Sequence, residues 1–236
     1  MEKEKNLTGS QRVENKLDSF IGKNRKILLI VGIVVLVAVI AVCVAVGVVQ
    51  SNTEKKFNAL AELEGQYETI ASLDSTSAEY SDSVAAFTTA ADSLISSASL
   101  NSYPGAKAAL LKADLAFAEG DYQTAADGYI AVSEAQSKTY LAPLCIMNAA
   151  ACYENLGDND TAIGLYNQVI NTYGDSNAFA PKAMFAIGRI YDAMGDTELA
   201  RAEFETLTGL YLVPENGGSP SEYARMAEAY LINYAE

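Results

Sequence analysis

The 236-residue chain contains no histidine. Histidine is the side chain most often used for general acid–base catalysis. Its absence also excludes Ser–His and Cys–His nucleophile pairs and most kinds of zinc site. A phosphate-binding loop is missing as well, because "ENGGSP" at 215–220 is not followed by Lys-Ser or Lys-Thr and does not open from a strand. We therefore expect no enzymatic activity and no cofactor.

Acidic residues are plentiful, but their spacing does not suit a metal. The segment "GDNDT" brings Asp158 and Asp160 close together, yet it lacks the Asp-x-Asp-x-Asp-Gly pattern and the later Glu of a calcium-binding loop. In a turn, helix capping is the ordinary role of such residues. We expect no metal site.

Only three cysteines occur, and they fit no disulfide framework. Cys43 lies within a long apolar run, while Cys145 and Cys152 are seven residues apart. On one helix this spacing separates them by about 10.5 Å along the axis, which is too far for a bridge. We expect both to be small buried apolar residues, and an unpaired redox thiol is the alternative.

Charge is absent from the segment 27–49, a continuous run rich in Val and Ile. As a helix it would be about 35 Å long, enough to cross a hydrocarbon core of about 30 Å. A cleaved signal peptide is the alternative, but the long polar segment 1–26 precedes the run. The run also exceeds the apolar region of a signal peptide, which is usually about 7–15 residues long. The pattern predicts one transmembrane helix, which serves as an uncleaved anchor.

The charges on the two sides of this run indicate its orientation. Residues 1–26 hold seven Lys or Arg and four acidic residues, whereas residues 27–236 hold 9 basic and 26 acidic residues, a net charge of −17. Positively charged flanks stay in the cytoplasm, so we expect a cytoplasmic segment at 1–26 and the remainder across the membrane. Such an acidic domain is poorly suited to nucleic acid or to an anionic lipid surface.

Residues 50–103 show helical periodicity and predict a linker helix followed by a second helix. Apolar residues recur in steps of three and four at Phe57, Leu60, Leu63, Tyr67, Ile70 and Leu73, and again at Tyr80, Val84, Phe87, Ala91, Leu94 and Ile95. The segment "DSTSA" at 74–78 provides a turn with capping residues between them.

From residue 104 onward the sequence repeats, and four kinds of landmark share nearly the same period. Glycines recur at a nearly constant interval, and each is followed by Ala five residues later and by an aromatic residue nine residues later. Prolines recur at almost the same interval as the glycines. These landmarks are Gly120, Gly157 and Gly195; Ala125, Ala162 and Ala200; Tyr129, Tyr166 and Phe204; and Pro104, Pro143, Pro181 and Pro220.

Each landmark has a physical role in a helix hairpin. Proline is tolerated in the first turn of a helix, and the glycine ends that helix with a positive φ. The following residue, Asp121, Asp158 or Asp196, caps the second helix or shapes the turn. The small Ala lets the two helices approach, and the aromatic residue fills the space one turn further on. The sequence therefore predicts an all-α solenoid over residues 104–236.

The hairpins resemble tetratricopeptide repeats. That family has small or Tyr residues in the middle and at the end of its first helix. The matching pairs are Ala150 and Tyr153, Gly188 and Tyr191, and Ala227 and Tyr230, with a looser match at Ala113 and Ala116. The chain departs from the family in having no Trp and in a period a few residues longer than is usual. The segment after Pro220 resembles a single capping helix.

The extra length falls in the connectors at 171–181 and 209–220, as in bacterial envelope proteins of this family. With its short basic N-terminus and single anchor, the chain is similar to the membrane-anchored ancillary subunits of the SecYEG translocon. This resemblance implies an inner-membrane protein whose periplasmic domain contacts the translocon, exported polypeptides and periplasmic chaperones. An adaptor in envelope assembly or cell division, and homo-oligomers formed through the repeats, are the alternatives.

The resemblance also implies a concave binding surface on the first helices. The second, fifth, ninth and twelfth positions of each repeat would face it: Lys107, Leu110, Asp114 and Phe117; Leu144, Met147, Ala151 and Glu154; Lys182, Phe185, Arg189 and Asp192. We predict Phe117, Met147, Phe185 and Arg189 as the protein-binding residues, because aromatic, Met and Arg side chains dominate interfaces. The alternative is that Phe117 and Phe185 pack against the neighbouring hairpin.

Overall fold

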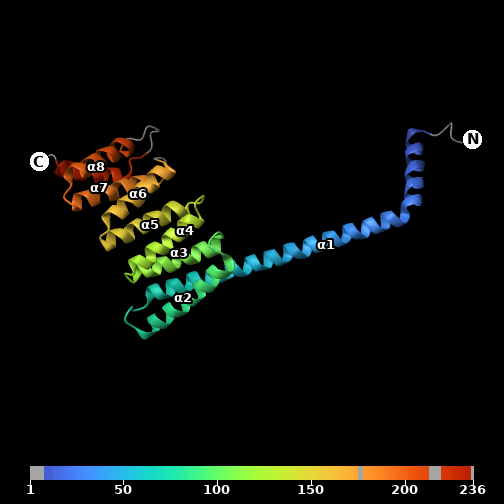
Figure 1. Cartoon of the computed structure of the whole chain (residues 1–236), viewed down its shortest axis with the longest axis horizontal. Helices are drawn as coiled ribbons and strands as arrows, with labels where there is room; N and C mark the ends of the chain where they lie inside the picture. Colours follow the sequence, from blue (N-terminus) through green and yellow to red (C-terminus); the bar gives the residue numbers. More distant parts are fainter. Residues whose placement is uncertain (1–7, 175–177, 213–218, 235–236) are drawn as a thin grey trace, which may run out of the picture. The chain divides into compact units, whose positions relative to one another are not determined.

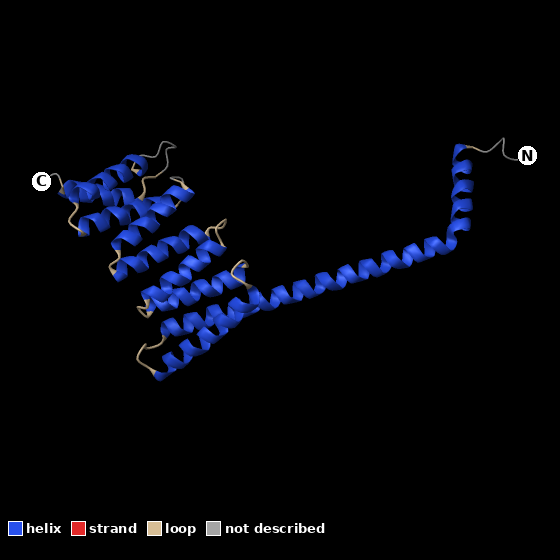
Figure 2. Ribbon diagram, in the orientation of Figure 1, coloured by secondary structure: helices blue, strands red, loops and turns tan. Residues whose placement is uncertain are grey.

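A computed structural model describes residues 8–174, 178–212 and 219–234, and all the regular structure in these ranges is helical (Figure 1, Figure 2). The helices are α1 (Gly9–Ser72), α2 (Ala78–Ala98), α3 (Tyr103–Ala118), α4 (Tyr122–Ala135), α5 (Leu141–Leu156), α6 (Asn159–Tyr173), α7 (Ala180–Ala193), α8 (Thr197–Tyr211) and α9 (Glu222–Asn233). The chain divides into two units, Met1–Lys55 and Lys56–Glu236. The predicted all-α class with a repeat solenoid is confirmed.

In the first unit, the described residues from Gly9 onward belong to α1. Residues 27–49 are all exposed, although the segment is strongly apolar. By length and composition α1 is able to span a membrane, a test that a signal sequence near an N-terminus also passes. An apolar surface of this length fits either a membrane span or a signal sequence.

The second unit begins with the C-terminal part of α1, which packs with α2 and α3. Leu60, Leu63 and Ile70 of α1 share one buried cluster with Phe87 and other apolar residues of α2 and α3. The predicted turn at 74–78 is present, and Ser77 caps α2 by accepting a hydrogen bond from the backbone N–H of Tyr80 at 3.1 Å. Phe57, the first residue of the periodic series, is exposed, and its ring stacks on Tyr103 with centroids 6.3 Å apart.

The remaining helices form three hairpins, α3–α4, α5–α6 and α7–α8, followed by the single helix α9. Successive helices pack against one another along the chain from α2 to α9, and α9 also packs on α7. The predicted capping helix after Pro220 is confirmed as α9. Parts of the two long connectors, residues 175–177 and 213–218, lie outside the described residues.

All three hairpins turn through the same corner. Gly120, Gly157 and Gly195 have φ values of 81°, 77° and 82°, as predicted for residues that end a helix in the left-handed region. In each corner the Asp that follows donates its backbone N–H to a carbonyl five residues earlier, at 2.9 Å, and the glycine donates to a carbonyl three residues earlier. This pair of bonds is the Schellman motif.

The corner aspartate also begins the next helix. The carboxylates of Asp121, Asp158 and Asp196 accept hydrogen bonds from the backbone N–H groups three residues later, at 3.2, 3.2 and 3.3 Å. The predicted capping role is therefore confirmed in all three hairpins. One residue thus ends the first helix with its N–H and caps the second with its side chain.

The Ala and aromatic landmarks lie in the cores between helices, as predicted. Ala125, Ala162 and Ala200 are fully buried, and the exposed fractions of Tyr129, Tyr166 and Phe204 are between 0% and 3%. Where the aromatic residue is Phe204, the facing position is Gly188, and a Cβ atom there would lie 2.5 Å from Cε1 of the ring. The close approach of ring and backbone therefore requires glycine.

Candidate protein-binding surface

The first helices α3 and α5 carry partly buried carboxylates that are held by tyrosine hydroxyls. Tyr129 donates to Asp114 at 2.7 Å, and Tyr166 donates to Glu154 at 2.5 Å. Both tyrosines come from the second helix of the same hairpin. The hydroxyls therefore fix the orientation of carboxylates on a neighbouring helix.

The two carboxylates differ in their further partners. Glu154 also accepts a hydrogen bond from the guanidinium of Arg189, so that one carboxylate joins α5, α6 and α7. Asp114 has no such ion pair among the described residues, and burial raises the pKa of its carboxyl, although the bond from Tyr129 acts in the opposite direction. Burial, followed by the bond to the carboxylate, likewise raises the pKa of the hydroxyls of Tyr129 and Tyr166.

The ion pair borders an open pocket between α5 and α7. Its lining residues are Ala151, Glu154, Asn155 and Arg189, and its volume is about 430 Å³. The exposed fractions of the Glu154 and Arg189 side chains are 16% and 44%, so the carboxylate is largely covered while the guanidinium reaches solvent. This polar hollow is therefore open to solvent mainly on the guanidinium side.

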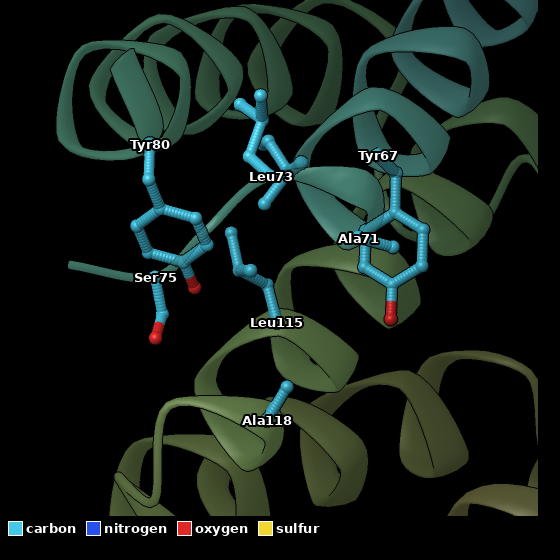
Figure 3. A pocket seen from close by; sticks show the side chains of 8 residues that line it. Tyr67, Ala71, Leu73, Ser75, Tyr80, Leu115 and Ala118 are labelled. Atoms are coloured by element: carbon cyan, nitrogen blue, oxygen red, sulfur yellow. The ribbon is translucent and has the colours of Figure 1, made fainter. Parts of the chain in front are cut away.

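A second pocket, with an apolar lining, lies between the C-terminal end of α1, the α1–α2 turn and the end of α3. Its volume is about 210 Å³, and it is lined by Tyr67, Ile70, Ala71, Leu73, Ser75, Tyr80, Leu115 and Ala118. Figure 3 shows Tyr67 and Tyr80 on opposite sides, with Leu73 and Leu115 between them. Sequence reasoning missed this pocket, because helical periodicity assigned its residues to packing faces and gave no information on whether the space between them is filled.

The two cysteines of α5 lie inside the repeats. Cys145 and Cys152 are free and buried, as predicted, and burial raises the pKa of their thiols to about 12 and about 11. Thiols with such values are protonated at neutral pH and react slowly. Within the described ranges, no three His, Cys, Asp or Glu side chains form a group able to hold a metal ion.

Comparison with known proteins assigns the repeats to a family. The model of the family described as "Tetratricopeptide repeat-like domain" matches residues 19–209, which is most of the chain. The chain belongs to the tetratricopeptide repeat-like family. The matched residues include the apolar run at 27–49 as well as the hairpins from α3 onward.

Individual relatives of the tetratricopeptide repeat-like chain are more distant. A TPR repeat-containing protein of Treponema pallidum (strain Nichols) is 27% identical over 95 residues, 40% of this chain and 39% of that protein. The chain thus matches about two fifths of the length of this curated relative. Two crystal structures of TPR-like repeats from a Podosopora anserina protein described as a kinesin light chain, one with a single substitution, have TM-scores of 0.52 and 0.51.

Each of these structures is 14% identical to this chain, and each alignment covers 74% of this chain and 85% of the solved chain. At this identity the likeness shows the fold alone.

Tetratricopeptide repeats serve as protein-interaction scaffolds and are typically not enzymes. The repeats identified here are therefore a scaffold for protein interaction.

Within the tetratricopeptide repeats, the predicted face positions separate into two groups. The fifth position of each repeat is buried: Leu110, Met147 and Phe185 have exposed fractions of 3%, 3% and 8%. The second, ninth and twelfth positions are all partly or fully exposed. The first-helix face, as we use the term below, consists of these exposed positions: Lys107, Asp114, Phe117, Leu144, Ala151, Glu154, Lys182, Arg189 and Asp192.

The four predicted binding residues therefore have different surroundings. Met147 is buried among residues of α5, α6 and α7, and the ring of Phe185 packs against Phe204 with centroids 5.7 Å apart. Phe117 is half-buried and meets Tyr122 edge to face, whereas Arg189 is exposed. These two ring contacts lie within each residue's own hairpin, and Phe185 also packs on Tyr223 and Tyr230 of the following helix α9. Contact of these four residues with a partner stays a prediction.

Proposed function

We propose that this protein is a single-pass inner-membrane protein whose periplasmic repeats bind polypeptides, as an ancillary component of the protein translocon. In this role it links exported polypeptides to periplasmic chaperones. The observation that carries the proposal is the family match, which runs through the exposed apolar segment and on through the repeats. A scaffold of this family attached beside a membrane is well placed to meet polypeptides that emerge there.

The charge distribution supports the proposed topology. Residues 1–26 carry seven basic residues and precede the apolar segment, while the acidic residues are concentrated after it. Positive residues at the cytoplasmic end oppose translocation of that end. The N-terminus is therefore cytoplasmic and the repeats are extracytoplasmic in this proposal.

Topology is tested by labelling single cysteines with a membrane-impermeant maleimide in intact cells whose outer membrane has been permeabilised. Ser96→Cys, at an exposed position of α2, is expected to react from outside, and Ser10→Cys is expected to react only after lysis. Cys43, which is exposed, is replaced by Ala in both variants, and the buried Cys145 and Cys152 give a low background. Labelling of Ser10→Cys but not Ser96→Cys in intact cells would reverse the orientation.

Partner binding is tested by photo-crosslinking in intact membranes from two positions of the first-helix face: Lys182, which is exposed, and Ala151, which is partly exposed and lines the pocket with Glu154 and Arg189. These positions are better than Phe185 itself, because that ring is buried. Gln168 of α6 and Glu205 of α8 are exposed on second helices and serve as matched controls. We expect adducts with translocon subunits, periplasmic chaperones or exported chains from the first-helix face alone.

The same experiment separates the alternatives. Adducts with outer-membrane or cell-wall assembly proteins, in place of the translocon, would assign the chain to an envelope-assembly or division adaptor. Adducts between copies of the chain, with a matching mass in detergent solution, would favour homo-oligomers. Equal background from both pairs of positions would exclude the first-helix face as the binding surface.

A further inference from the structure

We propose that the apolar pocket between α1, the α1–α2 turn and α3 binds a short cationic segment of a partner polypeptide, which inserts one apolar side chain flanked by Lys or Arg. The inference rests on the proposed polypeptide-binding function and adds a second surface with a defined chemistry. It depends on three properties of the pocket: its lining, its size and the charges around it.

The lining and size suit a single apolar side chain. Leu73, Leu115 and Ile70 supply aliphatic surface, and the rings of Tyr67 and Tyr80 form opposite walls (Figure 3). The volume of about 210 Å³ is below the roughly 300–1,000 Å³ of sites that hold drug-sized ligands. A side chain anchored on a peptide therefore fits better than a whole small molecule.

The entrance is bordered by exposed residues with small side chains. Ala71 and Ala118 line the pocket and are exposed at its edge. A buried core cavity would be closed by larger side chains, whereas here the lining stays open to solvent from the ends of α1 and α3. The position at a helix corner also leaves room for a peptide backbone outside the pocket.

The charges around the pocket favour a cationic partner. Residues 57–106, which provide most of its lining, contain seven acidic residues and no Lys or Arg. Glu68, Asp74, Glu79 and Glu119 are exposed and adjoin lining residues in the sequence. Hydrogen bonds from Thr76 lower the pKa of Asp74, so this carboxylate stays charged.

The nearest basic residue on the neighbouring helix does not cancel this charge. Lys112 of α3 is already paired with Asp92 of α2 at 2.6 Å. Tyr80 donates its hydroxyl to Glu119 across 3.4 Å, which places a carboxylate beside the apolar wall. A peptide with Lys or Arg on both sides of an apolar residue matches this arrangement, and a neutral or acidic peptide does not.

The test titrates the purified full-length protein, in neutral detergent, into the fluorescein-labelled peptide SKKFKKS. Binding is measured as the rise in fluorescence anisotropy. Two matched peptides separate the contributions: SKKSKKS lacks the apolar anchor, and SEEFEES reverses the charge. We expect SKKSKKS to bind at least tenfold more weakly than SKKFKKS, and SEEFEES to show no saturable binding. Added salt should weaken SKKFKKS binding.

Pocket variants test the location. Ala118→Phe places a ring at the pocket edge, while Ala86→Phe adds the same bulk at an exposed position of α2 outside the lining. We expect at least a tenfold loss of SKKFKKS affinity for the first variant and less than a twofold change for the second. Ala71→Leu provides an independent filling variant if Ala118→Phe lowers the melting temperature by more than a few degrees.

Three results would overturn the inference. The first is that SKKFKKS binds the wild type and well-folded pocket-filling variants with equal affinity. The second is that SKKSKKS binds the wild type as tightly as SKKFKKS does. The third is that a peptide copying residues 10–26 binds the pocket more tightly than SKKFKKS. The last result would assign the pocket to the N-terminal segment of the chain itself, which also requires both to lie on one side of the membrane. Crosslinks from the first-helix face do not depend on this assay, so either proposal is able to fail without the other.

Discussion

The α5–α6 and α7–α8 hairpins turn through the same corner, but they fill the space behind it in different ways. In α5–α6 the aromatic landmark is Tyr166, whose hydroxyl binds Glu154 on the exposed side. In α7–α8 it is Phe204, whose ring lies against Gly188 and also packs on Tyr230, with centroids 4.8 Å apart. One repeat pattern therefore supports two kinds of packing.

The difference teaches which part of the repeat is constrained. Both hairpins require an aromatic ring nine residues after the corner glycine, since the ring is buried in each. The hydroxyl is needed only where a carboxylate lies within reach, and glycine is needed only where the ring approaches the first helix closely. We therefore expect loss of the hydroxyl to matter in α5–α6, and addition of a methyl group at the facing glycine to matter in α7–α8.

The largest effect is expected for Phe204→Ala. The ring is fully buried and contacts Phe185, Tyr230 and Tyr234. Removing it leaves a cavity, and the free energy of unfolding should fall by about 3–5 kcal/mol. Urea unfolding of the full-length protein in detergent measures this change. A loss below about 1 kcal/mol would show that α9 collapses onto α7 without the ring.

Gly188→Ala should lower the free energy of unfolding by about 1–3 kcal/mol, because the new methyl group overlaps the ring of Phe204. Gly164→Ala is the matched control: this glycine is helical and exposed, and a Cβ atom there meets nothing within 4 Å. The control should be stabilised by up to about 1 kcal/mol, the helix propensity difference. The comparison breaks down if both variants change stability in the same direction.

Loss of a hydroxyl should matter more in α3–α4 than in α5–α6. Tyr129→Phe leaves Asp114 without its described side-chain donor, so we expect a loss of about 1–3 kcal/mol. Tyr166→Phe leaves Glu154 paired with Arg189, and a loss of about 0.5–1.5 kcal/mol is expected. Parallel urea titrations at neutral pH decide this order, and a reversed order would remove the role assigned to Arg189.

The smallest effect is a pH dependence that comes from Asp114. Burial raises the pKa of its carboxyl, so the folded state holds the proton more tightly than the unfolded chain does. Its stabilising contribution is complete below the ordinary Asp pKa of 3.8 and is lost as pH rises through the raised pKa. The melting temperature of Asp114→Asn minus that of the wild type should therefore increase as pH rises through this interval. A constant difference would show that Asp114 does not titrate there.

Much of the fold could be predicted from the sequence, because the corner signals are local. Gly157 and Asp158 specify a positive φ, a Schellman motif and an N-cap within a few residues, so their pattern needs no tertiary information. The same holds for Ser77 and for the burial of Ala162 and Tyr166, which follows from helical periodicity. Length and charge alone likewise indicated the apolar part of α1.

The candidate surface was harder to predict, since it depends on how neighbouring hairpins meet. Met147 and Phe185 have side chains typical of interfaces, yet the adjacent helices cover them. The Arg189–Glu154 pair joins residues 35 positions apart, which no local spacing reveals. The apolar pocket depends on side chains from α1, the α1–α2 turn, α2 and α3 leaving space unfilled, and its one sequence signal is the absence of Lys and Arg from residues 57–106.

The double use of the corner aspartate has a consequence for how this chain tolerates insertions. A residue added between Gly157 and Asp158 would separate the end of α5 from the start of α6, because one backbone N–H and one carboxylate of the same residue serve both. In all three hairpins the alanine follows the glycine by five residues, whereas the stretch from Ala162 to the next corner glycine is one residue longer than the stretch from Ala125. Length variation is thus tolerated between hairpins and excluded at their corners, which keeps each hairpin a rigid module while its spacing from the next remains adjustable.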